Sequence, residues 1–235
     1  MIAENIAPLI SLIALEVILG IDNIIFISIL ADKLPVEQRS KLRYIGLGLA
    51  MFMRLALLTM LTWILKLDKD LFTIFGQSFT GKCIILIIGG LFLLYKSTKE
   101  IYEKTEIAEN PNPTTPKNAS FGKLLVEIII IDLVFSVDSI ITAVGMVSKL
   151  WIMYVAVIVS VFIMLVASKP ISNFITKHPS FKILALSFLM MIGVALIAEG
   201  FQFEIPKGYI YFSMAFAFFV DIIQMKSISN GTKNK

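Results

Sequence analysis

Two stretches of the chain, LIALEVILGIDNIIFISIL at residues 12–30 and EIIIIDLVFSVDSIITAV at residues 127–144, decide what kind of protein this is. Both are long apolar runs with the length and composition of membrane-spanning helices. Both also carry carboxylates near the middle, where an ionised side chain costs at least ~2.5–3.5 kcal/mol on insertion scales. Acids retained at such a cost indicate a functional site.

The composition of the whole chain agrees with a membrane protein. Its 235 residues are 57% hydrophobic and only 16% charged, and the apolar runs are continuous rather than alternating. Lipid permits helices and closed barrels, and barrel strands would alternate. We therefore expect an all-α polytopic protein with a single transmembrane domain over residues 1–235. The first residues lack the basic segment of a cleavable signal, so we expect the first helix to be retained.

Seven apolar runs are separated by polar segments, which predicts seven transmembrane helices. The predicted spans are residues 6–30, 44–66, 81–98, 121–147, 150–168, 181–199 and 206–225. A polar, proline-rich stretch, EKTEIAENPNPTTPKNAS, dominates the segment 99–120, which we expect to be a cytoplasmic linker. Most of the 21 Lys and Arg residues fall on the side of the membrane that holds this linker and the C-terminal tail. We expect an inner (plasma) membrane protein, and the positive-inside rule predicts that its N-terminus lies outside and its C-terminus in the cytoplasm.

The two acidic stretches are copies of one pattern: an acid, three apolar residues, Gly or Ser, one apolar residue, Asp, and then Asn or Ser. The matched pairs are Glu16 with Asp132, Gly20 with Ser136, Asp22 with Asp138, and Asn23 with Ser139. Three spans separate the copies, so they are expected to cross the bilayer in opposite directions. This predicts a 3+3 inverted repeat, residues 6–98 and 121–199, with an appended seventh helix at 206–225.

The depth of each acid can be estimated from its distance to the cytoplasmic end of its span, at ~1.5 Å per residue. The estimate places Asp22 and Asp132 at similar depths, and it places Glu16 and Asp138 together at a greater depth. Each level therefore receives one acid from each motif. On a regular helix Asp22 points about 120° away from Glu16, and Asp138 is similarly turned from Asp132. A kink or unwound turn near Gly20 or Ser136 would bring all four acids to one cavity.

The polar side chains of the motifs have the oxygen ligands that hard divalent cations prefer. Carboxylate, amide and hydroxyl oxygens suit Mg²⁺, Ca²⁺ and Mn²⁺. No thiol or imidazole lies near the motifs, which argues against zinc or copper. The predicted metal ligands are Glu16, Asp22, Asn23, Asp132, Asp138 and Ser139. Ser136 and Gly20 are expected to act in gating.

Arg54 offers a different explanation for the acids, because it lies within the second predicted span. A buried ion pair with either Asp22 or Asp132 is expected, and the sequence leaves both partners open. One Arg does not balance four acids, so we expect a bound cation or protons to supply the remaining positive charge.

An enzyme is not expected from this sequence. It has no Ser–His or Cys–His arrangement, no H-E-x-x-H motif, and no G-x-x-x-x-G-K-[ST] nucleotide loop. Its basic residues are scattered over short loops, which argues against nucleic acid as a partner. The expected partners are a divalent metal ion and the lipid bilayer, with no required cofactor.

Three segments, EVILGIDNIIFISILADKLP, IDLVFSVDSIITAVGM and IAEGFQFEIPKGYIYFSMAFAFFVDI, closely resemble TerC-type membrane proteins, and the resemblance covers essentially the whole chain. Many members of that family are implicated in moving Mn²⁺ out of the bacterial cytoplasm, and some in supplying metal to secreted enzymes. The resemblance therefore implies export of Mn²⁺ through the acidic motifs. Because the sequence has no nucleotide-binding loop, we expect a secondary transporter driven by an ion gradient. As a hypothesis, the same carboxylates carry protons when the metal leaves, which would give H⁺ exchange.

The chain departs from the family pattern at two positions. Gly20 stands where Ser is common, which removes a hydroxyl ligand, and Asp221 stands where Glu is expected. The change at Gly20 favours a divalent cation in general over Mn²⁺ specifically, whereas the change at Asp221 is a mild one. Two alternatives stay open: a Ca²⁺ or proton transporter on the same scaffold, and a non-transporting membrane factor that docks secretion machinery or secreted metalloproteins.

Overall fold

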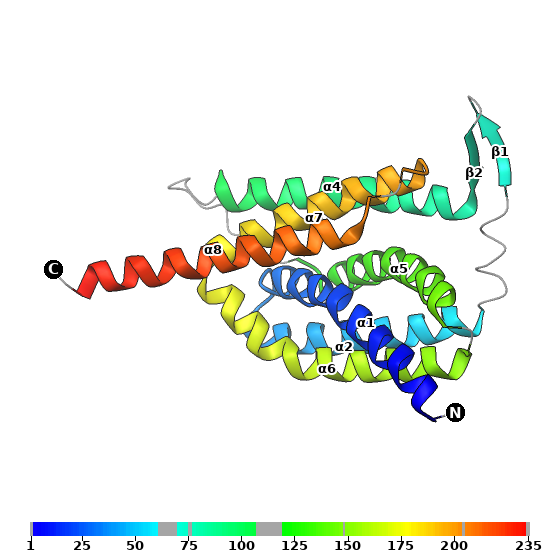
Figure 1. Cartoon of the computed structure of the whole chain (residues 1–235). Helices are drawn as coiled ribbons and strands as arrows, with labels where there is room; N and C mark the ends of the chain where they lie inside the picture. Colours follow the sequence, from blue (N-terminus) through cyan, green and yellow to red (C-terminus); the bar gives the residue numbers. More distant parts are fainter. Residues whose placement is uncertain are drawn as a thin grey trace.

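The computed structural model describes residues 2–60, 70–74, 77–106, 119–147, 149–203 and 205–233. Over these residues the chain forms seven helices and one short hairpin (Figure 1). The helices are α1 (Ile2–Ala31), α2 (Val36–Thr59), α4 (Gly81–Thr105), α5 (Phe121–Met146), α6 (Leu150–Lys177), α7 (Pro179–Gly200) and α8 (Lys207–Lys233). The strands β1 (Asp70–Ile74) and β2 (Gln77–Thr80) pair antiparallel.

All seven predicted helices are present, and six of them are long and apolar enough to cross a membrane. The exception is α5, the helix of the second acidic motif, whose central residues from Val134 to Ile140 are all buried. The chain is therefore a multi-pass membrane protein built from helices, as the composition predicts.

Three helices extend beyond the ends of the spans predicted for them, because polar helical turns continue the apolar run. The second helix begins at Val36, directly after Pro35, and not at residue 44; it ends at Thr59, and residues 61–69 lie outside the described part. The fifth span was expected to end at residue 168, but α6 continues through Pro170 to Lys177. The linker was expected from residue 99, but α4 extends to Thr105. Apolar content marks the part of a helix in lipid and not its polar extension.

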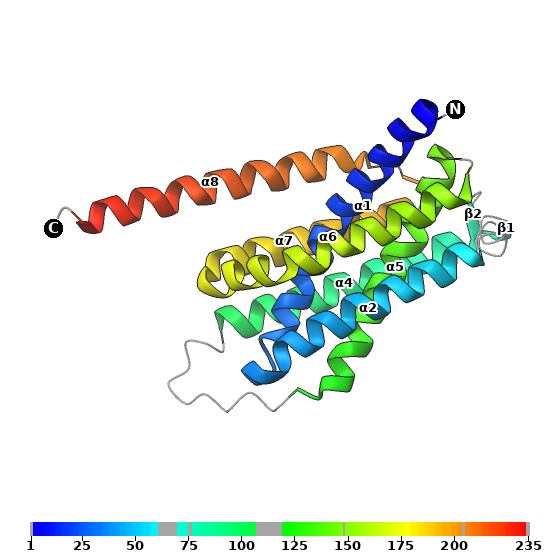
Figure 2. The same cartoon turned by 90° about the horizontal axis from the view of Figure 1, so that it is seen from below.

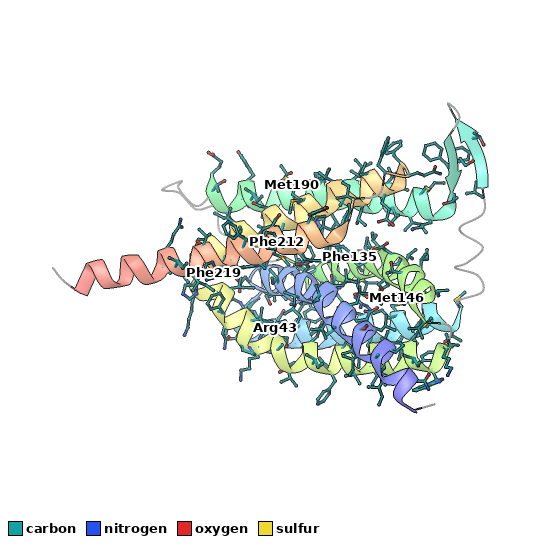
Figure 3. The ribbon with its side chains drawn as sticks, viewed as in Figure 1. Arg43, Phe135, Met146, Met190, Phe212 and Phe219 are labelled. Atoms are coloured by element: carbon teal, nitrogen blue, oxygen red, sulfur yellow. The ribbon has the colours of Figure 1, made fainter. Side chains whose placement is uncertain are left out.

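Helices from the two halves of the chain pack against each other. Helix α1 packs along α6, α2 packs against α5 and α6, and α4 packs along α7. Figure 2 shows α1 running obliquely across the bundle, where it meets α2, α5, α6 and α7. Helix α8 packs on α7, and its C-terminal part extends beyond the other helices. Phe212 and Phe219 project from α8 and are exposed, as expected of a lipid-facing surface (Figure 3).

Two glycines allow α4 and α7 to approach backbone to backbone. A Cβ atom on Gly90 would lie 2.6 Å from the carbonyl oxygen of Gly193, and one on Gly193 would lie 3.0 Å from that of Gly90. Small residues at a helix crossing are the usual means of close packing in membranes. This contact is reciprocal, so it joins the two halves of the chain at one fixed point.

Candidate functional site

Arg54 of α2 occupies the centre of the bundle and binds an acid from each motif. Its Nη1 donates to Glu16 Oε2 at 2.6 Å, and its Nη2 donates to Asp132 Oδ1 at 2.6 Å. All three side chains are buried, at 2–4% exposure. Charge-assisted hydrogen bonds of this length are strong, and they tie α1, α2 and α5 together.

Two further motif residues complete the hydrogen bonding of Asp132. The amide Nδ2 of Asn23 donates to Oδ1 at 3.0 Å, and the hydroxyl of Ser136 donates to Oδ2 at 3.2 Å. The Oδ1 atom of Asn23 is buried and has no hydrogen-bond partner among the described residues. Ser139 is also buried, and its hydroxyl donates to the Ser136 carbonyl at 3.4 Å. We call Glu16, Asn23, Arg54, Asp132 and Ser136 the arginine cluster.

The arginine cluster corrects the predicted pairing of the acids. The depth estimate placed Glu16 with Asp138 and Asp22 with Asp132, but Arg54 brings Glu16 and Asp132 together. The sequence left open which aspartate Arg54 pairs with, and that aspartate is Asp132. Helices α1 and α5 cross obliquely, so equal counts from the helix ends do not correspond to equal positions.

Asp22 and Asp138, the second acids of the two motifs, line a different pocket. The pocket has about 470 Å³ of empty space between α1, α5, α7 and the start of α8. It is lined by Leu19, Asp22, Phe135, Asp138, Ile192, Ala195, Leu196, Glu199, Ile205, Ile210 and Tyr211. Asp22 is 8% exposed and Asp138 is 4% exposed. We call this space the aspartate pocket.

Asp22 also lines a second pocket, which extends along α1 in the opposite direction. Its walls are Ile25, Phe26 and Ile29 of α1, Ala185, Leu186 and Leu189 of α7, and Met214 of α8. The aspartate pocket reaches Glu199 at the C-terminal end of α7, whereas this second pocket reaches Ala185 near its beginning. Asp22 therefore stands where two spaces meet, one toward each end of α7.

The prediction that all four acids share one cavity is wrong. Arg54 holds Glu16 and Asp132, and the other two acids line the aspartate pocket. Within the described residues, no three carboxylate, histidine or cysteine side chains gather as a metal-binding group. The expected unwound turn is also absent there, because α1 and α5 are continuous helices through Gly20 and Ser136.

Gly20 is explained by packing. A Cβ atom at this position would overlap the sulfur of Met164 on α6. Helix α1 packs along α6, so a side chain at residue 20 would force Met164 to move. The missing hydroxyl therefore coincides with a close contact between helices, and no gating role follows from the geometry of Gly20.

Two ion pairs of α4, one with α5 and one with the turn after α1, were not predicted from the sequence. Lys96 is 8% exposed and lies 2.7 Å from a carboxylate oxygen of Glu127. Glu100 is fully buried and pairs with Lys33. Burial lowers the pKa of Lys33, but the hydrogen bonds and charges of Glu100 and Glu103 outweigh it, so the pKa is raised overall. The spacing of residues 96, 100 and 103 along one helix face is the signal that points to this site.

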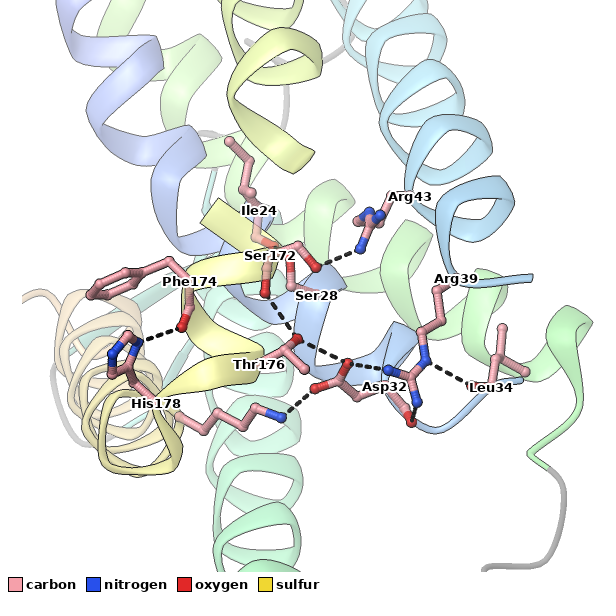
Figure 4. A network of polar contacts seen from close by, with 11 residues as sticks. Ile24, Ser28, Asp32, Leu34, Arg39, Arg43, Ser172, Phe174, Thr176 and His178 are labelled. Atoms are coloured by element: carbon pink, nitrogen blue, oxygen red, sulfur yellow. Dashed lines mark hydrogen bonds and ion pairs between the residues drawn. The ribbon is translucent and has the colours of Figure 1, made fainter. Parts of the chain in front are cut away.

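Asp32, at the turn between α1 and α2, holds these helices to the corner between α6 and α7 (Figure 4). Its carboxylate accepts hydrogen bonds from Arg39 at 3.2 Å and Thr176 at 3.3 Å, and it pairs with Lys182. Arg43 also donates to Ser172 of α6.

An ion pair lies at the opposite end of the bundle as well, where Lys82 of α4 is 3.0 Å from Glu199 of α7. Contacts between the two halves of the chain therefore lie at both ends of the bundle.

Comparison with known proteins identifies relatives along nearly the whole chain. A 216-residue region, 92% of this chain, is 48% identical to the UPF0053 inner membrane protein YoaE of Escherichia coli K12 and covers 42% of that protein. The chain is 46% identical over 224 residues to the UPF0053 protein YegH, again 42% of its length. A UPF0053 protein of Haemophilus influenzae is 49% identical over 218 residues, which is 92% of its length.

This chain thus spans less than half of YoaE and YegH but nearly all of the Haemophilus relative. No solved structure matches it. The model of the integral membrane protein TerC family matches residues 1–234. The chain therefore belongs to the integral membrane protein TerC family.

Proposed function

We propose that this protein is a secondary transporter that exports a divalent cation, with Mn²⁺ as the first substrate to test. One observation carries the proposal: Asp22 and Asp138, one from each copy of the motif, line the same pocket within the membrane-spanning bundle. A pair of carboxylates in an apolar pocket is costly unless a positive charge or protons join it. A hard divalent cation is the partner that their oxygens suit.

The arginine cluster supports this assignment because Arg54 already binds the other two motif acids. Arg54 already provides hydrogen-bond donors to Glu16 and Asp132, so a cation there would have to compete with a buried guanidinium. We propose that the cluster holds α1, α2 and α5 in register and that the cation binds at Asp22 and Asp138.

The two pockets that meet at Asp22 offer a route for transport. In the orientation that the loop charges predict, the aspartate pocket opens toward the outside and the second pocket toward the cytoplasm. Rocking of residues 6–98 against residues 121–199 would expose Asp22 to one pocket at a time. Both aspartates accept protons when the cation leaves, which would couple export to inward H⁺ movement.

Mn²⁺ uptake into inside-out vesicles tests the proposal. The native protein is compared with Asp22→Asn, with Asp138→Asn, and with Glu37→Gln, which changes an exposed acid at the start of α2. We expect uptake by the native protein and by Glu37→Gln, and a loss of at least about tenfold in either Asn variant. Thermal unfolding in detergent checks that the Asn variants are folded.

Normal uptake by both Asn variants would contradict the site. If folded native protein takes up no Mn²⁺ from vesicles of confirmed orientation, the manganese assignment fails, and the same assay with Ca²⁺ and a pH indicator is the next step. Failure of all three ions would favour the partner-docking alternative.

A further inference from the structure

We infer that Tyr211 of α8 determines the affinity of the aspartate pocket for its cation, so that the seventh helix is part of the site. This inference rests on the proposed function. The appended helix lies outside both copies of the repeat, and neither acidic motif includes it. Its position in the fold nevertheless brings Tyr211 into the lining of the pocket that Asp22 and Asp138 share.

The composition of the pocket singles out Tyr211. Among the described residues that line it, the polar side chains are three acids, Asp22, Asp138 and Glu199, and one hydrogen-bond donor, Tyr211. Tyr211 interacts electrostatically with both aspartates. It is therefore the described lining residue that can donate a hydrogen bond to the carboxylates without adding a positive charge.

A phenolic hydroxyl fits both states of a transport site. When the cation has left, the hydroxyl can donate a hydrogen bond to an oxygen of Asp22 or Asp138 and reduce the cost of burying that group. When a hard cation binds, the lone pairs of the same oxygen can turn toward the metal or toward a water in its coordination shell. A Phe at this position would keep the ring and lose both interactions.

The rest of α8 fixes the direction in which Tyr211 points. Ile210 and Met214 are buried one turn apart on the inward face, and each lines one of the two pockets that meet at Asp22. Phe218, two turns from Tyr211, stacks on Phe181 of α7 with ring centroids 5.4 Å apart. Residues seven apart lie on nearly the same helix face, so this stack holds the Tyr211 face against the pocket.

The chain contains a matched control in Tyr209, two residues away on the same helix. Its side chain is 72% exposed and does not line the aspartate pocket. Tyr209→Phe and Tyr211→Phe are the same chemical change, and both keep an aromatic ring on α8. A difference between them reports the position of the hydroxyl and not a general effect on the helix.

The test is Mn²⁺ binding to the full chain in lipid nanodiscs, measured from the loss of the free Mn²⁺ signal in electron paramagnetic resonance. Native protein, Tyr211→Phe, Tyr209→Phe and Asp22→Asn are titrated in parallel, and Ca²⁺ competition is measured for each. We expect Tyr211→Phe to raise the Kd for Mn²⁺ about tenfold, equivalent to ~1.4 kcal/mol, and to change the ratio of Mn²⁺ to Ca²⁺ affinity. We expect an unchanged Tm for this variant and native values for Tyr209→Phe.

The outcomes separate the inference from the function beneath it. If the native protein binds Mn²⁺, Asp22→Asn abolishes binding, and Tyr211→Phe binds within twofold of native, the role of Tyr211 is overturned and the aspartate site stands. Equal weakening in Tyr209→Phe would also overturn the role of Tyr211. If the native protein does not bind Mn²⁺, or Asp22→Asn binds like native, the proposed metal site fails together with the inference.

Discussion

At the scale of single residues, the main finding is that the four motif acids have two different surroundings. The sequence identifies all four acids and Arg54, because a charged residue inside an apolar run is conspicuous and must be compensated. It does not reveal which acids Arg54 reaches, since that depends on the angle at which α1 crosses α2 and α5. Glu16 and Asp132 contact Arg54, and Asp22 and Asp138 line the aspartate pocket.

Replacing Arg54 tests the role of the arginine cluster. Arg54→Met leaves two buried carboxylates without their cation, so we expect a loss of ~3–5 kcal/mol in stability or failure to accumulate folded protein. The triple variant Glu16→Gln/Arg54→Met/Asp132→Asn removes all three charges, and we expect it to recover most of the loss. Thermal unfolding in detergent, followed by size-exclusion chromatography, measures both. If Arg54→Met alone is as stable as the native protein, the structural role of Arg54 is contradicted.

At the scale of secondary structure, hydropathy locates each of the seven described helices, but it gives neither their ends nor their contacts, and it does not predict the hairpin of β1 and β2. An apolar run predicts only the part of a helix that lies in lipid. Helix α2 begins earlier than its apolar run, at Val36, and α4 continues beyond its apolar run to Thr105, in both cases as polar helical turns. The pair of Lys96 with Glu127 was missed for a related reason. A charge near the end of a span looks exposed until the neighbouring helix is placed beside it.

The crossing of α4 and α7 gives a prediction at this scale. Gly90→Ala would put a Cβ atom 2.6 Å from the carbonyl oxygen of Gly193 and 2.7 Å from the side chain of Ile197. The helices would have to separate, so we expect a destabilisation of ~1–3 kcal/mol. Gly48→Ala in α2 is the control, because a Cβ atom there has nothing within 4 Å, and we expect an unchanged or slightly higher Tm. Equal Tm values for the two variants would show that the backbones are not in close contact.

At the scale of the whole molecule, the helix contacts between the two halves of the chain are those expected of related halves. In the predicted repeat, α1, α2 and α4 of residues 6–98 correspond to α5, α6 and α7 of residues 121–199. The contact of α1 with α6 therefore corresponds to that of α5 with α2, and both contacts are present. The contact of α1 with α7 likewise becomes that of α5 with α4, and α4 with α7 maps onto itself. These contacts agree with the duplicated motif, while the inverted orientation of the halves stays a prediction. The part proposed for α8 could not be predicted from the sequence, because nothing in α8 repeats the motif.

Locating the bound cation is the sharpest test of the proposed metal site at Asp22 and Asp138. Crystals of the full chain grown with Mn²⁺ and measured at the manganese absorption edge would show the metal as an anomalous peak. We expect a peak between Asp22 and Asp138, beside Tyr211, and none within the arginine cluster. A peak at Glu16 and Asp132, or bound manganese away from both pairs of acids, would contradict it.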